Sequence, residues 1–145
     1  MVPDMQSPPL ADAKVSTRAK LAALWTSVMF CYVYGDYFEL YTPGKLQEML
    51  NGKMALGAVT QGMLLGTSIL MAVPSLMIFL SLALPSGVSR WLNVAAGLFY
   101  AIIMTLILVG GGWNFYRFFA VIEVSLTLLV VWYAWRWPRQ QPGAA

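Results

Sequence analysis

The sequence contains no histidine and only one cysteine, Cys31. Without an imidazole, the chain has no Ser-His or Cys-His nucleophile and no His-based metal site, so we expect it to bind neither haem nor zinc on its own. A single cysteine also excludes an intrachain disulfide. With no metal cluster or cofactor motif in view, we expect no cofactor, and an intramembrane enzyme is the weakest of the three functional hypotheses set out below.

Charged residues are also scarce: they make up 10% of the chain, against 59% hydrophobic residues. Soluble domains carry about a quarter charged residues, so a chain this apolar predicts a surface that faces a lipid bilayer. Nine Lys and Arg residues face six Asp and Glu residues, giving a net charge of +3. The excess is spread over tails and loops and forms no basic stripe, so we expect no nucleic-acid partner.

Four apolar runs predict an all-α, four-helix transmembrane bundle. We expect the membrane domain at 21–137, with spans at 21–41, 58–84, 91–109 and 115–135, a mobile cytoplasmic tail at 1–20 and a C-terminal tail at 138–145. Three of the runs are close to the length of about 20 residues that a span requires, and the run at 58–84 is longer, so it should either tilt or begin outside the bilayer. Pro74 should kink the second span and free the carbonyl four residues earlier. Residues 45–50 are either a short interfacial helix or an ordered loop.

The distribution of basic residues predicts the orientation of the bundle. Four spans place both termini on one side, together with six basic residues: Lys14, Arg18, Lys20, Arg90, Arg136 and Arg139. The other side holds Lys45, Lys53 and Arg117. Because cytoplasmic loops carry the excess of Lys and Arg, both termini are expected inside. Five tryptophans, Trp25, Trp91, Trp132, Trp135 and Trp137, then gather toward the inner interface.

Several short patterns carry a resemblance to a known family. In chain order they are KLAALW (20–25), YGD (34–36), VP (73–74), MIFL (77–80), RWLN (90–93), IE (122–123) and WYAW (132–135). Over about residues 20–137 the chain resembles a bacterial family of small four-span membrane proteins of unknown function. The resemblance implies a four-helix membrane fold in the bacterial inner (plasma) membrane and an acidic residue in both the first and the last span. The family has no established activity, so the resemblance implies no catalytic role.

Two acidic residues inside the spans define the main candidate site. An ionisable group at membrane depth costs several kcal/mol unless it is paired or hydrated, and such groups often mark function. At about 1.5 Å per residue, Asp36 lies about 24 Å along its helix from Lys20, in the outer half of the membrane. Glu123 enters from the outside to roughly 10–12 Å, close to the same depth. We therefore predict that the two carboxylates meet inside the bundle.

Five further residues could complete this site. Tyr32 shares a face with Asp36, Tyr116 shares a face with Glu123, and Gln61 can join from the second span. Glu39 and Arg117 lie near the outer interface. Arg117 is about 120° around the helix from Glu123, so it should either snorkel to the headgroups or pair with Glu39 or Asp36.

An acidic site with aromatic walls suits a small organic cation or an amphipathic ligand. The structural alternative is that the buried acids tie helices together through hydrogen bonds and that the tyrosines pack with satisfied hydroxyls. Two functions stand ahead of an enzyme: a small-molecule binding or transport protein, and an accessory or scaffold subunit of a larger membrane complex. Gly62 and Gly66 form a small-xxx-small pair that would serve the bundle or a homo-oligomer.

Overall fold

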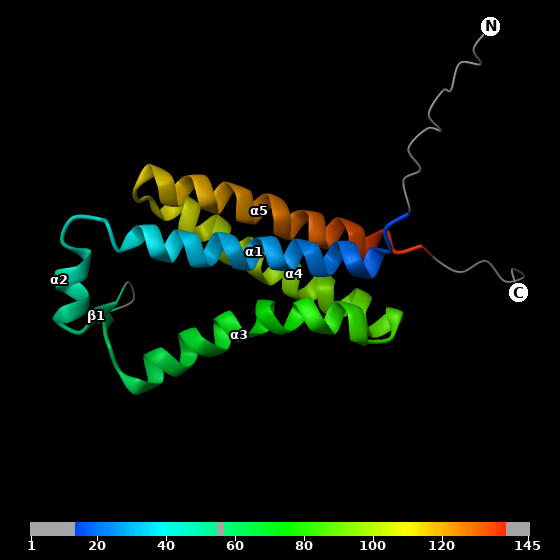
Figure 1. Cartoon of the computed structure of the whole chain (residues 1–145), viewed down its shortest axis with the longest axis horizontal. Helices are drawn as coiled ribbons and strands as arrows, with labels where there is room; N and C mark the ends of the chain where they lie inside the picture. Colours follow the sequence, from blue (N-terminus) through cyan, green and yellow to red (C-terminus); the bar gives the residue numbers. More distant parts are fainter. Residues whose placement is uncertain (1–13, 55–56, 139–145) are drawn as a thin grey trace, which may run out of the picture.

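Four long helices run up and down along one another in the computed structural model, which describes residues 14–54 and 57–138 (Figure 1). They are α1 (Thr17–Glu39), α3 (Gln61–Ala83), α4 (Ser86–Gly110) and α5 (Asn114–Trp135). Helix α1 begins and α5 ends at the same end of the bundle, here called the terminal end. The expected tail residues 1–13 and 139–145 lie outside the described residues.

Three of these helices, α3, α4 and α5, are long and apolar enough to cross a membrane. The prediction of a helical membrane protein is confirmed to that extent. Helix α1 has 23 residues, as α3 has, but it carries four charged side chains, Arg18, Lys20, Asp36 and Glu39. It packs against both α3 and α5.

Capping residues set helix starts that differ from the predicted ones. The Ser16 hydroxyl accepts a hydrogen bond from the Ala19 amide at 3.3 Å, so α1 begins at Thr17, inside the tail that was predicted for 1–20. Thr60 caps α3 in the same way, and that helix begins three residues later than predicted. Such caps satisfy an amide that the helix leaves free. Helix α4 begins at Ser86, directly after Pro85, so Arg90 lies inside the helix rather than before it.

The connection between α1 and α3 lies at the opposite end of the bundle, here called the α2 end (Figure 1). Residues Lys45–Leu50 form helix α2, so of the two alternatives for this segment, a short helix and an ordered loop, the helix is found. None of its residues is buried. It is followed by a small antiparallel hairpin of β1 (Lys53–Met54) and β2 (Gly57–Ala58), which the sequence did not predict. Gly52 makes the turn after α2 with a φ of 69°, a conformation that favours glycine.

A buried polar network joins three helices near the terminal end. The Trp25 indole donates a hydrogen bond to Asn93 Oδ1 at 2.7 Å, and the Ser81 hydroxyl donates to the same oxygen at 3.1 Å. Asn93 Nδ2 donates to the Ser89 carbonyl at 2.8 Å. All four side chains have no exposed surface. Trp25 therefore differs from an exposed interfacial tryptophan, because its N–H finds a partner inside the bundle.

Helices α4 and α5 form the most extensive contact in the bundle. Gly97 allows the two backbones to approach, since a Cβ atom there would lie 2.8 Å from Val131 Cγ2 and 3.2 Å from the Thr127 carbonyl oxygen. Real Cβ atoms essentially never come within 3.0 Å of a heavy atom of a residue that is not a chain neighbour. Close approach at a glycine is a common way for membrane helices to gain packing contacts.

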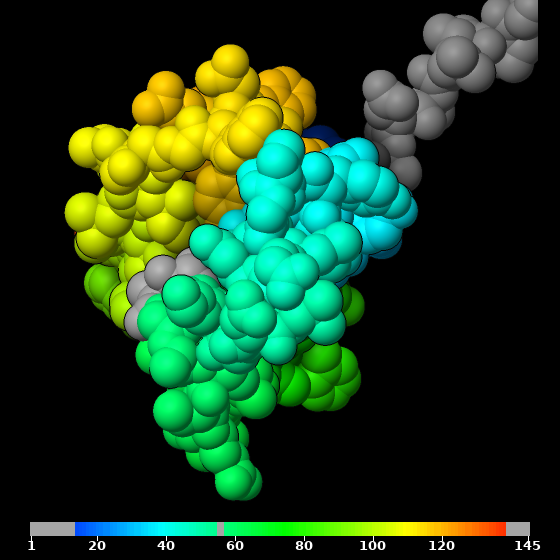
Figure 2. Space-filling view, turned by 90° about the vertical axis from the view of Figure 1, so that its left-hand side faces the viewer, coloured from blue at the N-terminus to red at the C-terminus, as the bar shows by residue number. Residues whose placement is uncertain are grey.

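Helix α3 packs on the bundle only over its second half. Its buried residues are Pro74, Met77 and Ser81, and none precedes the proline. The first half diverges from α4 toward the α2 end (Figure 1), and Figure 2 shows its first turns projecting away from the rest of that end. Pro74 has no amide hydrogen, so the Leu70 carbonyl lacks its helical donor. The Tyr100 hydroxyl donates to that carbonyl instead, at 2.6 Å.

Candidate functional site

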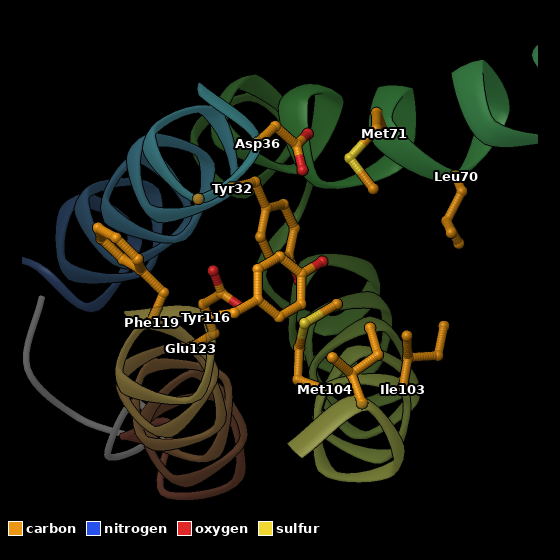
Figure 3. Close-up of a pocket in the computed structure, with 11 residues that line it drawn as sticks. Tyr32, Asp36, Leu70, Met71, Ile103, Met104, Tyr116, Phe119 and Glu123 are labelled. Carbon is orange, nitrogen blue, oxygen red and sulfur yellow. The ribbon is translucent and has the colours of Figure 1, made fainter. Parts of the chain in front are cut away.

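A cavity of about 110 Å³ lies where α1, α3, α4 and α5 face one another in the half of the bundle toward the α2 end (Figure 3). Its lining residues are Tyr32, Gly35, Asp36, Leu70, Met71, Ile103, Met104, Ile107, Tyr116, Phe119 and Glu123. Most of this wall is apolar. The polar groups are two carboxylates and two tyrosine hydroxyls, and they come from α1 and α5 alone.

The two carboxylates reach the cavity from the neighbouring helices α1 and α5. Asp36 comes from α1 and Glu123 from α5, and both side chains point toward the space around the tyrosines (Figure 3). Glu123 is 5% exposed, whereas Asp36 lies at the exposed rim. Neither carboxylate forms a salt bridge with a Lys or Arg side chain of the described residues. The salt bridge found among these residues joins Lys45 Nζ to Glu39 Oε1 at 2.6 Å. The lining of the cavity contains no basic residue. The lining of this cavity therefore holds no counter-charge, whereas Lys45 and Lys53 line an adjoining cavity that Asp36 also reaches.

The tyrosines add polar groups that are free to bind a ligand. Tyr32 is 6% exposed, and its hydroxyl is buried without a hydrogen-bond partner among residues 14–54 and 57–138. This differs from the expectation that the hydroxyl would be satisfied. An unpartnered buried polar group costs about 1–3 kcal/mol, so a bound ligand or water that reaches this hydroxyl gains that energy. Tyr116 is partly buried beside it.

Two larger cavities adjoin the first. One, of about 570 Å³, extends between α3 and α4 to the start of α5; the other, of about 490 Å³, lies between α1, α2, the hairpin and α3. Tyr116 lines all three cavities. Asp36 lines both the first cavity and the one beside α2. The acidic site is thus the meeting point of a wider hollow, which exists because the first half of α3 stands away from the bundle.

Three of the seven predicted site residues lie elsewhere. Gln61 is exposed at the first position of α3 and lines none of these cavities, because the helix diverges before it reaches that residue. Arg117 is exposed and lines none of them either. It does not pair with Glu39, since Glu39 pairs with Lys45. Glu39 lines the two larger cavities but not the acidic one. The structure brings together the other four: Asp36, Glu123, Tyr32 and Tyr116.

The apolar wall of the site was not predicted. It comes from Leu70 and Met71 on α3 and from Ile103, Met104 and Ile107 on α4. In the sequence these residues are ordinary members of apolar runs, and nothing distinguishes them from lipid-facing neighbours. The one informative residue near them is Pro74. It indicates that a backbone hydrogen bond of α3 is missing, so that another donor, such as Tyr100, is needed.

The chemistry available at the site is the binding of a cation or a hydrogen-bond donor. Carboxylates accept hydrogen bonds and attract positive charge, and aromatic faces attract cations within about 6 Å. In the described residues no group of three or more His, Cys, Asp and Glu side chains could hold a metal ion. Together, the fold and the site define a class of protein: a helical membrane protein with an acidic and aromatic cavity.

The chain belongs to a family of unknown function, DUF6326, whose model matches residues 12–144. The expected membership of a family without established activity is thereby confirmed over most of the chain. No curated protein and no solved structure matches the sequence.

Proposed function

We propose that this protein is a small-molecule binding or transport protein and that its ligand is an organic cation. The observation that carries the proposal is the pair of carboxylates, Asp36 and Glu123, which face one cavity with no basic side chain in its lining. A carboxylate at membrane depth is costly unless it is neutralised or hydrated, and a cationic ligand supplies the missing charge. The rings of Tyr32, Tyr116 and Phe119 add faces on which such a cation is favourable.

The proposal includes four spans, a bacterial inner membrane and cytoplasmic termini. Helix α1 lies along α3 and α5, and its 23 residues make it about 35 Å long, so it crosses wherever they cross. The terminal end carries basic side chains beside aromatic rings: the Arg136 guanidinium lies 4.0 Å from the centre of the Trp132 ring, and Lys20 Nζ lies 5.2 Å from that of Tyr133. Such residues are typical of a cytoplasmic interface. The cavity then lies in the outer half of the bilayer.

The test is cation binding to the purified protein in lipid nanodiscs. Thermal unfolding is followed against tetramethylammonium, tetraethylammonium and ethylammonium, with the neutral alcohol ethanol as a chemical control. We expect at least one of the cations to stabilise the protein and ethanol to have no effect at the same concentration. Asp36→Asn and Glu123→Gln should each weaken the binding by about tenfold or more, because each removes one of the two charges.

The matched control is Glu48→Gln, since Glu48 is an exposed carboxylate on α2 that lines none of the three cavities. It should bind as the wild type does. The proposal is rejected if no cation stabilises the wild-type protein, or if both site variants bind as tightly as Glu48→Gln.

A second function, an accessory or scaffold subunit of a membrane complex, is favoured by one observation. The first turns of α3 contribute no buried residue, and a Cβ atom at Gly62 or Gly66 would meet nothing within 4 Å. A partner helix could therefore approach closely there. Copurification in a mild detergent discriminates: a stable heterologous partner supports this function, and a pure homo-oligomer counts against it.

A further inference from the structure

The acidic cavity does not end at its carboxylates. Along Leu70, Ile103 and Ile107 it shares its wall with the cavity of about 570 Å³ between α3 and α4. The shared residues come from the facing sides of these two helices, so the larger cavity continues the smaller one. We call it the α3–α4 groove.

The α3–α4 groove is mostly apolar, with Glu39, Thr42 and Thr67 as its polar side chains other than Tyr116, and it lies between two helices that are apolar enough to cross a membrane. Beyond the shared residues its walls include Leu106, Trp113 and Phe115. Helices α3 and α4 make few contacts with each other, and no α3 residue before Pro74 is buried. In a bilayer this opening would face hydrocarbon rather than water. A ligand that uses the groove therefore needs an apolar segment.

We infer that the ligand is an amphiphilic amine, with its ammonium head between Asp36 and Glu123 and its alkyl tail in the α3–α4 groove. This rests on the proposed function and goes further in naming the substrate class and the route of entry from the membrane. Charge complementarity selects the head, because the two carboxylates have no basic partner. The groove selects the tail, because a cavity of about 110 Å³ has no room for a long chain.

The lining of the site favours an amine without an adjoining phosphate. Neither the acidic cavity nor the α3–α4 groove contains a Lys or Arg residue in its wall. A phosphate next to the ammonium would lie among the carboxylates Asp36, Glu39 and Glu123, and of the two lysines in the adjoining cavity beside α2, Lys45 is already paired with Glu39. A zwitterionic lipid headgroup is therefore a worse match than a simple long-chain amine.

The experiment compares four probes on the protein in lipid nanodiscs, each expressed as its total concentration at one fixed lipid concentration. Decyltrimethylammonium has head and tail, tetramethylammonium has the head alone, decanol has the tail alone, and lysophosphatidylethanolamine has an ammonium next to a phosphate. We expect decyltrimethylammonium to bind about tenfold or more tightly than each of the other three.

The groove itself is tested by a matched pair of variants on α3. Thr67 lines the α3–α4 groove but not the acidic cavity, and the next residue, Ser68, is exposed and lines neither. Both hydroxyls donate to a carbonyl of their own helix. Thr67→Trp should fill the groove and weaken decyltrimethylammonium binding by about tenfold, while tetramethylammonium binding stays unchanged. Ser68→Trp should alter neither.

The outcomes separate this inference from the proposed function. If tetramethylammonium binds as tightly as decyltrimethylammonium and Thr67→Trp changes nothing, the proposed cation site stands and the amphiphilic ligand is refuted. If lysophosphatidylethanolamine binds best, the ligand is a lipid headgroup and the inference is overturned. If no cation binds the wild-type protein, the proposed function fails as well.

Discussion

The hydrogen bond from the Tyr100 hydroxyl to the Leu70 carbonyl should stabilise the protein only while position 74 is a proline. Pro74 cannot donate to Leu70, and the Tyr100 hydroxyl, 2.6 Å away, takes the place of the missing amide. Replacing Tyr100 by Phe removes the donor and leaves the carbonyl unsatisfied. Replacing Pro74 by Ala restores an amide at position 74 that can donate to the same carbonyl. The two substitutions together therefore form a double-mutant cycle with a sign and a size that follow from the structure.

The expected size comes from the cost of an unsatisfied carbonyl. Hydrogen bonds between membrane helices contribute about 0.6 kcal/mol on average and at most about 1.7 kcal/mol. A buried acceptor left without a donor costs about 1–3 kcal/mol. Tyr100→Phe keeps the ring contacts, which include an edge contact with Trp25 at 5.9 Å between centroids. We therefore expect Tyr100→Phe to lower the free energy of unfolding by about 1–2 kcal/mol in the wild-type background.

In the Pro74→Ala background the same change should cost about 0.3 kcal/mol or less, giving a coupling energy of about 1 kcal/mol. The assay is reversible unfolding in mixed micelles, followed by circular dichroism as the fraction of denaturing detergent rises. Tyr34→Phe, at an exposed tyrosine on α1, serves as the control and should be neutral in both backgrounds. Equal costs for Tyr100→Phe with and without the proline would refute the assignment of Tyr100 as the replacement donor.

Two further predictions concern the packing of the terminal half. Gly97→Ala should lower the free energy of unfolding by about 1–3 kcal/mol, because the new methyl would lie 2.8 Å from a Val131 methyl; a neutral effect in the same unfolding assay would contradict the close α4–α5 approach. Asn93→Ala should cost roughly 1–3 kcal/mol, because it leaves the buried Trp25 indole without its acceptor. Trp25→Phe should then cost less in the Asn93→Ala background than in the wild type, where it also breaks the hydrogen bond, and full additivity of the two changes would contradict the bond.

The four long helices were predictable because hydrophobicity and length indicate them. All four apolar runs contain a helix, and α5 begins within one residue of its predicted start and ends at the predicted residue, Trp135. The errors occur at helix starts, where a single side chain decides. Ser16 and Thr60 moved the starts of α1 and α3 by accepting one backbone hydrogen bond each. The hairpin was not predicted because two-residue strands lack an alternating pattern that sequence reading could detect.

Part of the site was predictable because charge is so scarce in the spans. Asp36 and Glu123 stood out as ionisable groups within apolar runs, and counting residues along the helices predicted similar depths for both. Gln61 was misplaced because its prediction placed the first turns of the second span against the bundle, although a kink at Pro74 was expected. Leu70 and Met71 still line the cavity, but the turns before them diverge from the bundle, and helical periodicity carries no information about the size of such a divergence.

The unequal packing of the two halves is what allows so small a bundle to hold a polar cavity. Toward the terminal end, all of the helices contribute fully buried side chains, among them Trp25, Met77, Asn93 and Val130. Toward the α2 end, α3 contributes none. Glu123, which forms no salt bridge among the described residues, and Tyr32, whose hydroxyl has no partner there, lie in this less tightly packed half. The proposed binding site requires such an arrangement, because tight packing of α3 at the terminal end leaves its first half free to stand away from the bundle.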